Sequence, residues 1–210
     1  MIKIINYGMG NGVSILNMIR KVNGIAELCS KPEQLDGAKA IILPGVGSFD
    51  NGMAKLENLK FINTLYNKVF LDKIPFLGVC LGMHLLFEKS EEGSLPGLGL
   101  IKGSIKKFNF SKLKLSSELK VPNMGWRIIK PNSNKNLFLG LENEARFYFA
   151  HSYYANCVNQ SDILATSTYG HQFTCSIRRD NIWGVQFHPE KSHKYGVTFF
   201  KNFLKIMNNV

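Results

Sequence analysis

The stretch FLGVCLGMHLLFEKS, residues 76–90, decides the fold that we predict for this chain. Its first four residues form a short apolar run with a β-branched member, which is typical of a buried strand. The apolar residues that follow recur at helical spacing, at Leu81, Leu85, Leu86 and Phe87. The change from strand to helix falls at Cys80. A strand that turns directly into a helix is the unit of a doubly wound α/β sheet.

Cys80 stands between Gly78 and Gly82 in the pattern G-x-C-x-G, the thiol counterpart of the nucleophile elbow G-x-S-x-G. The glycines allow a sharp turn without a Cβ clash, so that the thiol projects at the carboxyl end of the strand. The start of a helix favours a thiolate through its free N–H groups and dipole. We therefore predict a nucleophile, with a buried cysteine acting as a small hydrophobe as the alternative.

Composition indicates an ordinary globular protein. The chain has 210 residues, 45% hydrophobic and 20% charged, which suits one α/β domain over residues 1–210. It has no run of 18 apolar residues, so we expect no membrane association, and its first residues lack the order of a signal peptide, so we expect a cytoplasmic protein. The four cysteines are scattered without a C-x-x-C pair, which favours free thiols over disulfides or a zinc site.

The formal net charge of +11 is partly local to residues 102–120. That segment has six lysines and one acidic residue, at Lys102, Lys106, Lys107, Lys112, Lys114, Glu118 and Lys120. A nucleic-acid surface is one interpretation. The lysines do not alternate with aromatic residues that could stack on bases, so we favour a solvated or partner-facing surface and expect no nucleic-acid partner.

Strands alternate with helices over the first half of the chain. We predict strands at 2–6, 26–29, 40–43 and 76–79, and helices over about 15–22 and 53–72, the second capped by Asp50. After a loop at 91–103, alternating segments predict strands at 105–110, 121–129, 146–150, 163–169, 172–177 and 182–187, followed by a helix at about 193–207. The sheet should begin parallel and gain antiparallel strands, with sites at the carboxyl ends of its parallel strands.

A cysteine nucleophile needs a base and a group that orients the base. His188 ends the predicted strand at 182–187, and Glu190 follows two residues later. Pro189 restricts the backbone between them, so both side chains can lie near one face and Glu190 can accept the ring proton. Four other histidines compete, at His84, His151, His171 and His193, but none has a carboxylate so rigidly placed. A polar strand end is the alternative.

Acyl transfer also needs donors for an oxyanion. The N–H of Leu81, directly after Cys80, is one candidate. A second donor must come from the loop after a neighbouring strand, and PGVG at residues 44–47 is a loop of the right kind. An ordinary loop after a strand is the alternative.

The motifs PGVG, GVCLGM, HSYY and QFHPEKS, in this order and spacing, resemble those of class I (triad) glutamine amidotransferases. Within that class the chain is similar to the HisH family, the glutaminase subunits of imidazole glycerol phosphate synthase. The segments NYGMGN, PGVGSFDNGM, SEEG, PNMGW and FYFAHSYY support this narrower resemblance. The motifs run from the first strand to the last helix.

The resemblance implies a flavodoxin-like, three-layer α/β/α fold and the hydrolysis of glutamine to glutamate and ammonia. It implies that Cys80 is the nucleophile, His188 the general base and acid, and Glu190 the residue that orients His188. The oxyanion would be held by Leu81 and by Val46 or Gly47. Glutamine would lie against Gly45, Gly47, His84, His151, Ser152 and Tyr153. No metal or organic cofactor is implied.

The resemblance also implies a heterodimer with a HisF-like (β/α)8 barrel, which receives the ammonia and makes imidazole glycerol phosphate in histidine biosynthesis. The positions that would face this partner are Asn11, Pro122, Met124, Trp126 and Lys191.

The chain departs from the family pattern at four positions. His84 replaces the usual Gln after CLGM, and Asn6 replaces the usual Asp before YGMGN. Asn123 and Arg127 replace His and Asn in the usual PH[MI]GWN. These departures leave open a HisH paralogue that supplies ammonia to enzymes modifying surface-polysaccharide or flagellar sugars. A docking subunit with a silent site is a further alternative, which the intact Cys80, His188 and Glu190 argue against.

Overall fold

The core of the molecule is a parallel sheet whose strands are almost entirely apolar. The structure, a computed structural model, describes residues 1–111, 119–132, 136–141 and 145–208. The parallel strands lie in the order β2–β1–β3–β4–β12. Their bounds are β1 Ile2–Ile5, β2 Ala26–Cys29, β3 Ala40–Gly45, β4 Phe76–Cys80 and β12 Ile182–Val185. Strands with both faces covered need apolar side chains on both, which explains the apolar runs of β3, β4 and β12. The charged residues Lys3 and Glu27 pair with each other on β1 and the edge strand β2.

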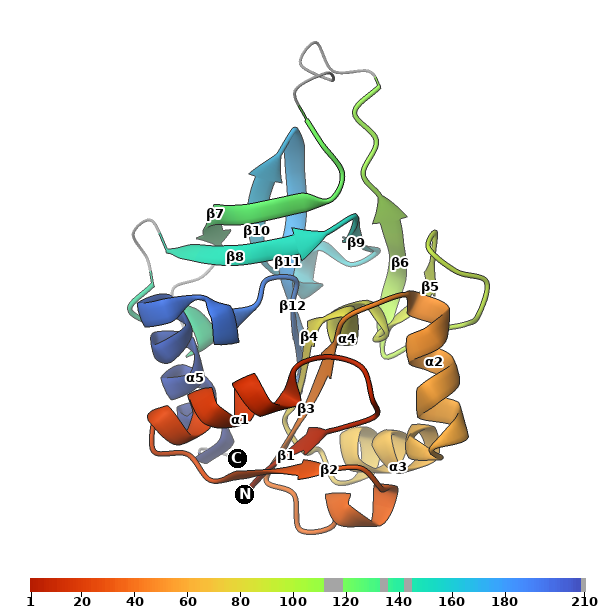
Figure 1. Cartoon of the computed structure of the whole chain (residues 1–210), viewed down its shortest axis with the longest axis vertical. Coiled ribbons are helices and arrows are strands. Elements are labelled where there is room, and N and C mark those ends of the chain that lie inside the picture. Colours follow the sequence, from red (N-terminus) through yellow and green to blue (C-terminus); the bar gives the residue numbers. More distant parts are fainter. Residues whose placement is uncertain (112–118, 133–135, 142–144, 209–210) are drawn as a thin grey trace.

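Helices cover both faces of this sheet, as Figure 1 shows. On one face, α1 Gly12–Lys21 and α5 His193–Asn208 share a core with alternate residues of the strands, such as Ile4 and Ile42. On the other face, α2 Phe49–Asn58 and α3 Phe61–Tyr66 pack with Ile5, Ile41 and Leu43. Successive strand residues point to opposite faces, so one short strand serves both cores. The three-layer α/β/α arrangement that we predicted is confirmed.

The second half of the chain extends the sheet beyond β12. The antiparallel strands β11 His171–Arg179, β10 Ile163–Tyr169, β7 Asn123–Pro131 and β8 Arg146–His151 follow one another across it. A branch from β11 runs through β9 Tyr153–Cys157 to β6 Ile101–Lys107 and β5 Phe87–Ser90. One sheet thus joins both halves of the chain. A single domain over residues 1–210 stays a prediction.

Several expected elements differ in the structure. The helix after Cys80 is one turn, α4 Leu81–His84, because the adjacent residues Leu85, Leu86 and Phe87 are buried on every side and lead into β5. β12 lies parallel to β4, although we expected an antiparallel strand there. The long helix at 53–72 is divided into α2, α3 and a π-helix, Asn67–Leu71.

Asp50 does not cap α2. It lies in the first turn of the helix, and its carboxylate accepts hydrogen bonds from the backbone N–H groups of Ser94 and Leu95 at 3.0 Å. In the lysine-rich segment, Lys106 pairs with Glu91 at 2.9 Å. Its members Lys112, Lys114 and Glu118 lie outside the described residues.

All four cysteines are free, as predicted, and all four are buried. Among the residues that the structure describes, no helix is both long and apolar enough to span a membrane.

Candidate active site

Strand order brings the predicted catalytic residues to one edge of the sheet. β4 lies between β3 and β12, and all three run parallel. Gly45 pairs with Cys80 across β3 and β4, while Val185 pairs with Val79 across β12 and β4. The segments that follow these three strands therefore leave the sheet side by side.

The turn at Cys80 is tight because backbones meet there. Cys80 itself has φ 54° and ψ −112°, a sparsely populated conformation for a residue with a side chain. A Cβ added to Gly82 would lie 1.8 Å from the carbonyl oxygen of Leu43, and one added to Gly78 would lie 2.7 Å from that of Gly82. The two glycines thus permit close packing, whereas the cysteine carries the strain. Because α4 has four residues, its dipole contributes less to a thiolate than we expected.

His188 is held on both sides. Its Nδ1 lies 2.8 Å from Oε1 of Glu190, so the carboxylate accepts the Nδ1 proton. Its backbone N–H donates to the carbonyl of Tyr148 at 2.9 Å, and the hydroxyl of Ser192 donates to its carbonyl at 2.6 Å. Ser192 also accepts from the Tyr148 N–H at 3.0 Å. With Nδ1 turned to Glu190, Nε2 is the nitrogen available to Cys80.

The pKa of His188 is raised to about 10. Burial alone would lower this pKa, but hydrogen bonds and charge interactions with Cys80 and Glu190 outweigh it. His188 is therefore a buried imidazolium at neutral pH, in contact with the sulfur atom. An imidazolium in that place suits a cysteine that reacts as a thiolate.

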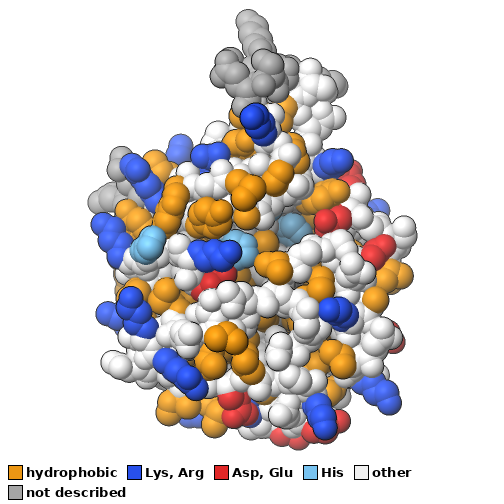
Figure 2. All heavy atoms as spheres, in the orientation of Figure 1, with side chains coloured by type: hydrophobic (Ala, Val, Ile, Leu, Met, Phe, Trp, Pro, Cys, Tyr) orange, Lys and Arg blue, Asp and Glu red, His pale blue; other side chains and the backbone are white. Residues whose placement is uncertain are grey.

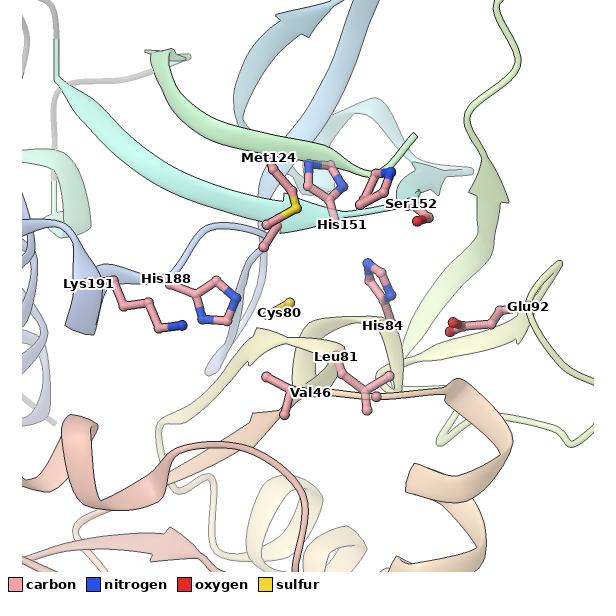
Figure 3. Close-up of a pocket in the computed structure, with 13 residues that line it drawn as sticks. Val46, Cys80, Leu81, His84, Glu92, Met124, His151, Ser152, His188 and Lys191 are labelled. Carbon is pink, nitrogen blue, oxygen red and sulfur yellow. The ribbon is translucent and has the colours of Figure 1, made fainter. Parts of the chain in front are cut away.

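These residues open onto a cavity of about 310 Å³. Figure 3 shows the Cys80 sulfur between the rings of His188 and His84, with His151 and Ser152 across from them. The lining comprises Val46, Gly47, Cys80, Leu81, His84, Glu92, Pro122, Met124, Ala150, His151, Ser152, His188 and Lys191. All three predicted oxyanion residues and four of the six predicted glutamine contacts are in this lining.

Two predicted glutamine contacts, Gly45 and Tyr153, lie outside the lining. Gly45 packs below it, where an added Cβ would lie 2.8 Å from both Leu81 Cβ and the Tyr7 hydroxyl. The buried Tyr7 hydroxyl has no hydrogen-bond partner among the described residues, and burial raises its pKa. Tyr153 instead uses its backbone carbonyl, which accepts from Nδ1 of His151 at 2.8 Å.

His84 and His151 are both buried, and burial lowers their pKa values, to about 4 and about 3. Both are thus neutral at pH 7. Nε2 of His84 lies 2.7 Å from Oε1 of Gln186, which is an acceptor, so His84 carries its proton on Nε2. The other nitrogen, Nδ1, is then an acceptor.

Both ring nitrogens of His151 are engaged by the protein. Since Nδ1 donates to the Tyr153 carbonyl, Nε2 must accept, and Asn123 Nδ2 donates to it at 2.9 Å. Asn123 Oδ1 in turn accepts from Nε of Arg127 at 3.2 Å. The ring of His151 therefore forms part of the cavity wall. The departures at Asn123 and Arg127 belong to one hydrogen-bonded unit.

The predicted partner-facing residues divide into two groups. Met124 and Trp126 are exposed on β7, Trp126 stacking on His193 at 5.5 Å, and Pro122 and Lys191 stand at the cavity mouth. Figure 2 shows hydrophobic side chains gathered over β7 and β8 beside histidine side chains. Asn11 is used differently, as its side chain caps α1 through the N–H of Ser14 at 3.1 Å.

Sequence reasoning missed Gln186 and Glu92 at this site, and it identified Asn123 only as a departure from the family pattern. Gln186 contacts both His84 and Cys80, and Glu92 lines the cavity while accepting from the Phe49 N–H at 3.0 Å. Asn123 is fully buried beside His151. Gln186 and Asn123 were visible as polar residues inside apolar strand segments, which is the signal that could have identified them.

Comparisons with known proteins agree on one family. The family model described as "Glutamine amidotransferase class-I" matches residues 3–207. The chain is 50% identical over 205 residues to "Imidazole glycerol phosphate synthase subunit HisH 2" of Methanococcus maripaludis, covering 98% of this chain and 99% of that one. It is 43% identical over 206 residues to the HisH subunit of Leptospira borgpetersenii, covering 98% and 100%. Among solved structures, PurLQS from Thermotoga maritima aligns with a TM-score of 0.73 at 17% identity, covering 99% and 97%, which shows a shared fold.

Proposed function

The chain belongs to the class-I glutamine amidotransferases and, among them, to the HisH subunits of imidazole glycerol phosphate synthase, and from this premise we propose that it hydrolyses glutamine with a Cys80–His188–Glu190 triad. The observation that carries the proposal is the shared cavity of Cys80 and His188, with Glu190 bonded to the far nitrogen of the imidazole at 2.8 Å.

The first half of the reaction forms a thioester. The Cys80 thiolate attacks the side-chain carboxamide carbon of glutamine, and the carbonyl oxygen becomes an oxyanion. The N–H of Leu81 and a donor from Val46 or Gly47 stabilise this charge. His188 gives its Nε2 proton to the nitrogen as the C–N bond breaks, so that ammonia leaves and a glutamyl thioester remains.

The second half releases glutamate. The Nε2 atom of His188 is now unprotonated and takes a proton from a water molecule as the water oxygen attacks the thioester carbonyl carbon. The tetrahedral intermediate collapses, the C–S bond breaks, and the Cys80 thiolate and the imidazolium are restored. Glu190 keeps the Nδ1 proton in place throughout and stabilises the imidazolium.

We place the substrate between Gly47, His84 and the segment at Ser152. The neutral His84 accepts at Nδ1, which suits the α-ammonium group of glutamine. The ring of His151 has no free nitrogen, so the backbone beside it and Ser152 are the groups left to bind substrate there.

The ammonia passes to a HisF-like barrel that forms a heterodimer with this chain in the cytoplasm and makes imidazole glycerol phosphate. The exposed apolar side chains of Met124 and Trp126 beside the cavity mouth support a partner on this face. Lys191, also at the mouth, can pair with an acidic group of the barrel.

A second candidate acceptor is an enzyme that modifies surface sugars. Two departures from the family pattern, Asn123 and Arg127, favour this acceptor. They lie on β7, the strand that presents Met124 and Trp126, and a different sequence on a partner-facing strand is consistent with a different partner. The chemistry at Cys80 would be the same. Growth of a histidine auxotroph lacking this subunit, when supplied with the gene, decides between the two acceptors.

The direct test is glutamate release from glutamine in the presence of the barrel partner. We expect release by the wild type and by Cys29→Ala, whose buried thiol lies on β2, and none by Cys80→Ala. Equal release by wild type and Cys80→Ala would overturn the proposed mechanism.

A further inference from the structure

Two buried polar side chains are linked to Cys80 by hydrogen bonds: Gln186 contacts the sulfur, and His84 contacts Gln186. Figure 3 shows His84 across the sulfur from His188. Gln186 has no exposed surface and His84 is 5% exposed. Nε2 of Gln186 lies 3.9 Å from the sulfur of Cys80, and Oε1 of the same amide lies 2.7 Å from Nε2 of His84. Buried polar groups are costly unless hydrogen-bonded, so this arrangement has a structural role at least.

The register of the sheet fixes where Gln186 stands. Val185 pairs with Val79 across β12 and β4, so the next residues are Gln186, the first after β12, and Cys80, the last of β4. The backbone N–H of Gln186 donates to the Cys175 carbonyl at 2.9 Å, which anchors the residue. The amide is thus held beside the sulfur by the end of a strand and by an anchored backbone.

The hydrogen bonds that join His84, Gln186 and Cys80 have only one donor-to-acceptor direction that suits a thiolate. If the amide nitrogen of Gln186 faces the sulfur, its oxygen faces His84 and requires the Nε2–H tautomer there. With the amide reversed, its oxygen would face the sulfur and repel negative charge. This orientation of Gln186 and the Nε2–H tautomer of His84 therefore occur together.

We propose that Gln186 is a further catalytic residue, which donates an N–H to the Cys80 thiolate, and that His84 is the positioning residue that holds this donor in place. The hydrogen-bonded series His84–Gln186–Cys80 involves neither His188 nor Glu190, and it stabilises the thiolate before glutamine binds. This proposal rests on the proposed function of Cys80 as nucleophile.

The other titratable groups around the sulfur remain the same in the variants that test this proposal. They are Tyr7 after β1, Glu92 after β5, His151 on β8, and His188, Glu190 and Lys191 after β12. Because burial lowers the pKa of His84 to about 4, the ring carries no charge above pH 5. Replacing His84 therefore removes a hydrogen-bond donor but no charge.

The experiment measures the rate of Cys80 alkylation by iodoacetamide between pH 5 and 9 in the full chain, without glutamine, and reads the Cys80 peptide by mass spectrometry. Loss of a hydrogen bond to a charged group should raise the midpoint of the rate profile by about one pH unit in Gln186→Met and His84→Leu. His84→Gln, which can still donate to Gln186, should keep the wild-type midpoint. So should Gln172→Met, a matched change on the exposed side of β11.

Wild-type midpoints in Gln186→Met and His84→Leu would overturn the proposal, and so would equal shifts in His84→Leu and His84→Gln. If Gln186→Met does not fold, the two His84 variants decide the question. The result is separable from the glutaminase test. If the wild type releases glutamate but these variants show no midpoint shift, only the role of Gln186 is refuted. If the variants show the shift but the wild type releases no glutamate, the hydrogen bond from Gln186 to the thiolate stands, whereas the proposed function and the catalytic role of Gln186 in it are refuted.

Discussion

Replacing His84 with Gln should make the protein markedly less sensitive to acid. His84 is buried and neutral, and burial lowers its pKa from the ordinary 6.5 to about 4. As the pH falls from 7 to 5, the unfolded chain takes up a proton at this residue while the folded chain does not. The folded state therefore loses stability that was present above pH 6.5.

The size of the loss follows from the two pKa values. At pH 5, about 1.5 pH units below its ordinary pKa, the unfolded side chain is protonated, whereas the folded one is still largely neutral. Between pH 7 and pH 5 this difference in proton binding lowers the free energy of unfolding by about 2 kcal/mol. His151, with a pKa lowered to about 3, should lose a similar amount over the same range. The contribution of His188 to stability changes in the opposite sense. Its pKa is raised to about 10 in the folded state, so its protonation stabilises the folded state, and this contribution is fully present below pH 6.5.

The assay is urea unfolding at pH 7 and pH 5, with the difference in unfolding free energy compared between variants. Comparing differences cancels the contributions of His151 and His188. The loss between the two pH values should be about 2 kcal/mol smaller in His84→Gln than in the wild type. His193→Gln, which changes an exposed histidine, should lose as much as the wild type. An identical loss in His84→Gln and wild type would refute a neutral, buried His84.

Three further predictions concern the triad, the turn and the partner. Glu190→Gln removes the charge that helps raise the pKa of His188, so that pKa should fall below about 10 and glutamate release should fall by about tenfold or more. Gly82→Ala puts a Cβ 1.8 Å from the Leu43 carbonyl oxygen, and urea unfolding should show a loss above about 4 kcal/mol or no folded protein. Trp126→Ala removes an exposed aromatic ring, and calorimetry should show binding to the barrel partner weakened about tenfold or more, with unchanged unfolding of the free chain.

A specific result would contradict each of these three predictions. Undiminished glutamate release in Glu190→Gln would remove Glu190 from the mechanism. For the turn, Gly37→Ala is the control, because an added Cβ there meets nothing within 4 Å although its φ is +69°. If both glycine variants were equally stable, close packing would not explain Gly82. Wild-type affinity in Trp126→Ala would place the partner elsewhere.

The parts of the site that sequence predicted are those set by local chemistry. The run FLGVC had to be a buried strand, and a glycine-flanked cysteine at its end had to turn sharply. The pair His188 and Glu190 was predicted from an extended segment, but in the structure only His188 is extended and Glu190 lies in a 3₁₀ turn, Pro189–Lys191. The contact forms all the same, because two residues so close in sequence need no other part of the chain to bring them together. The structure gives the Glu190 contact at 2.8 Å.

The parts that sequence missed depend on which strands are neighbours. Gln186 and His84 are 102 positions apart and meet because β12 lies beside β4, a pairing that no local pattern encodes. The same order made β12 parallel where its alternating pattern suggested an antiparallel strand. The helix expected at Phe87 failed for a different reason, since an unbroken apolar run fits a buried strand as well as a helix.

The most direct test of the account is labelling by 6-diazo-5-oxo-L-norleucine, a glutamine analogue whose reactive carbon stands where the carboxamide would be. We predict one adduct, on the peptide that contains Cys80, formed more slowly when glutamine is present and lost in Cys80→Ala. An adduct on Cys29, Cys157 or Cys175, or labelling of Cys80 that glutamine does not slow, would contradict it.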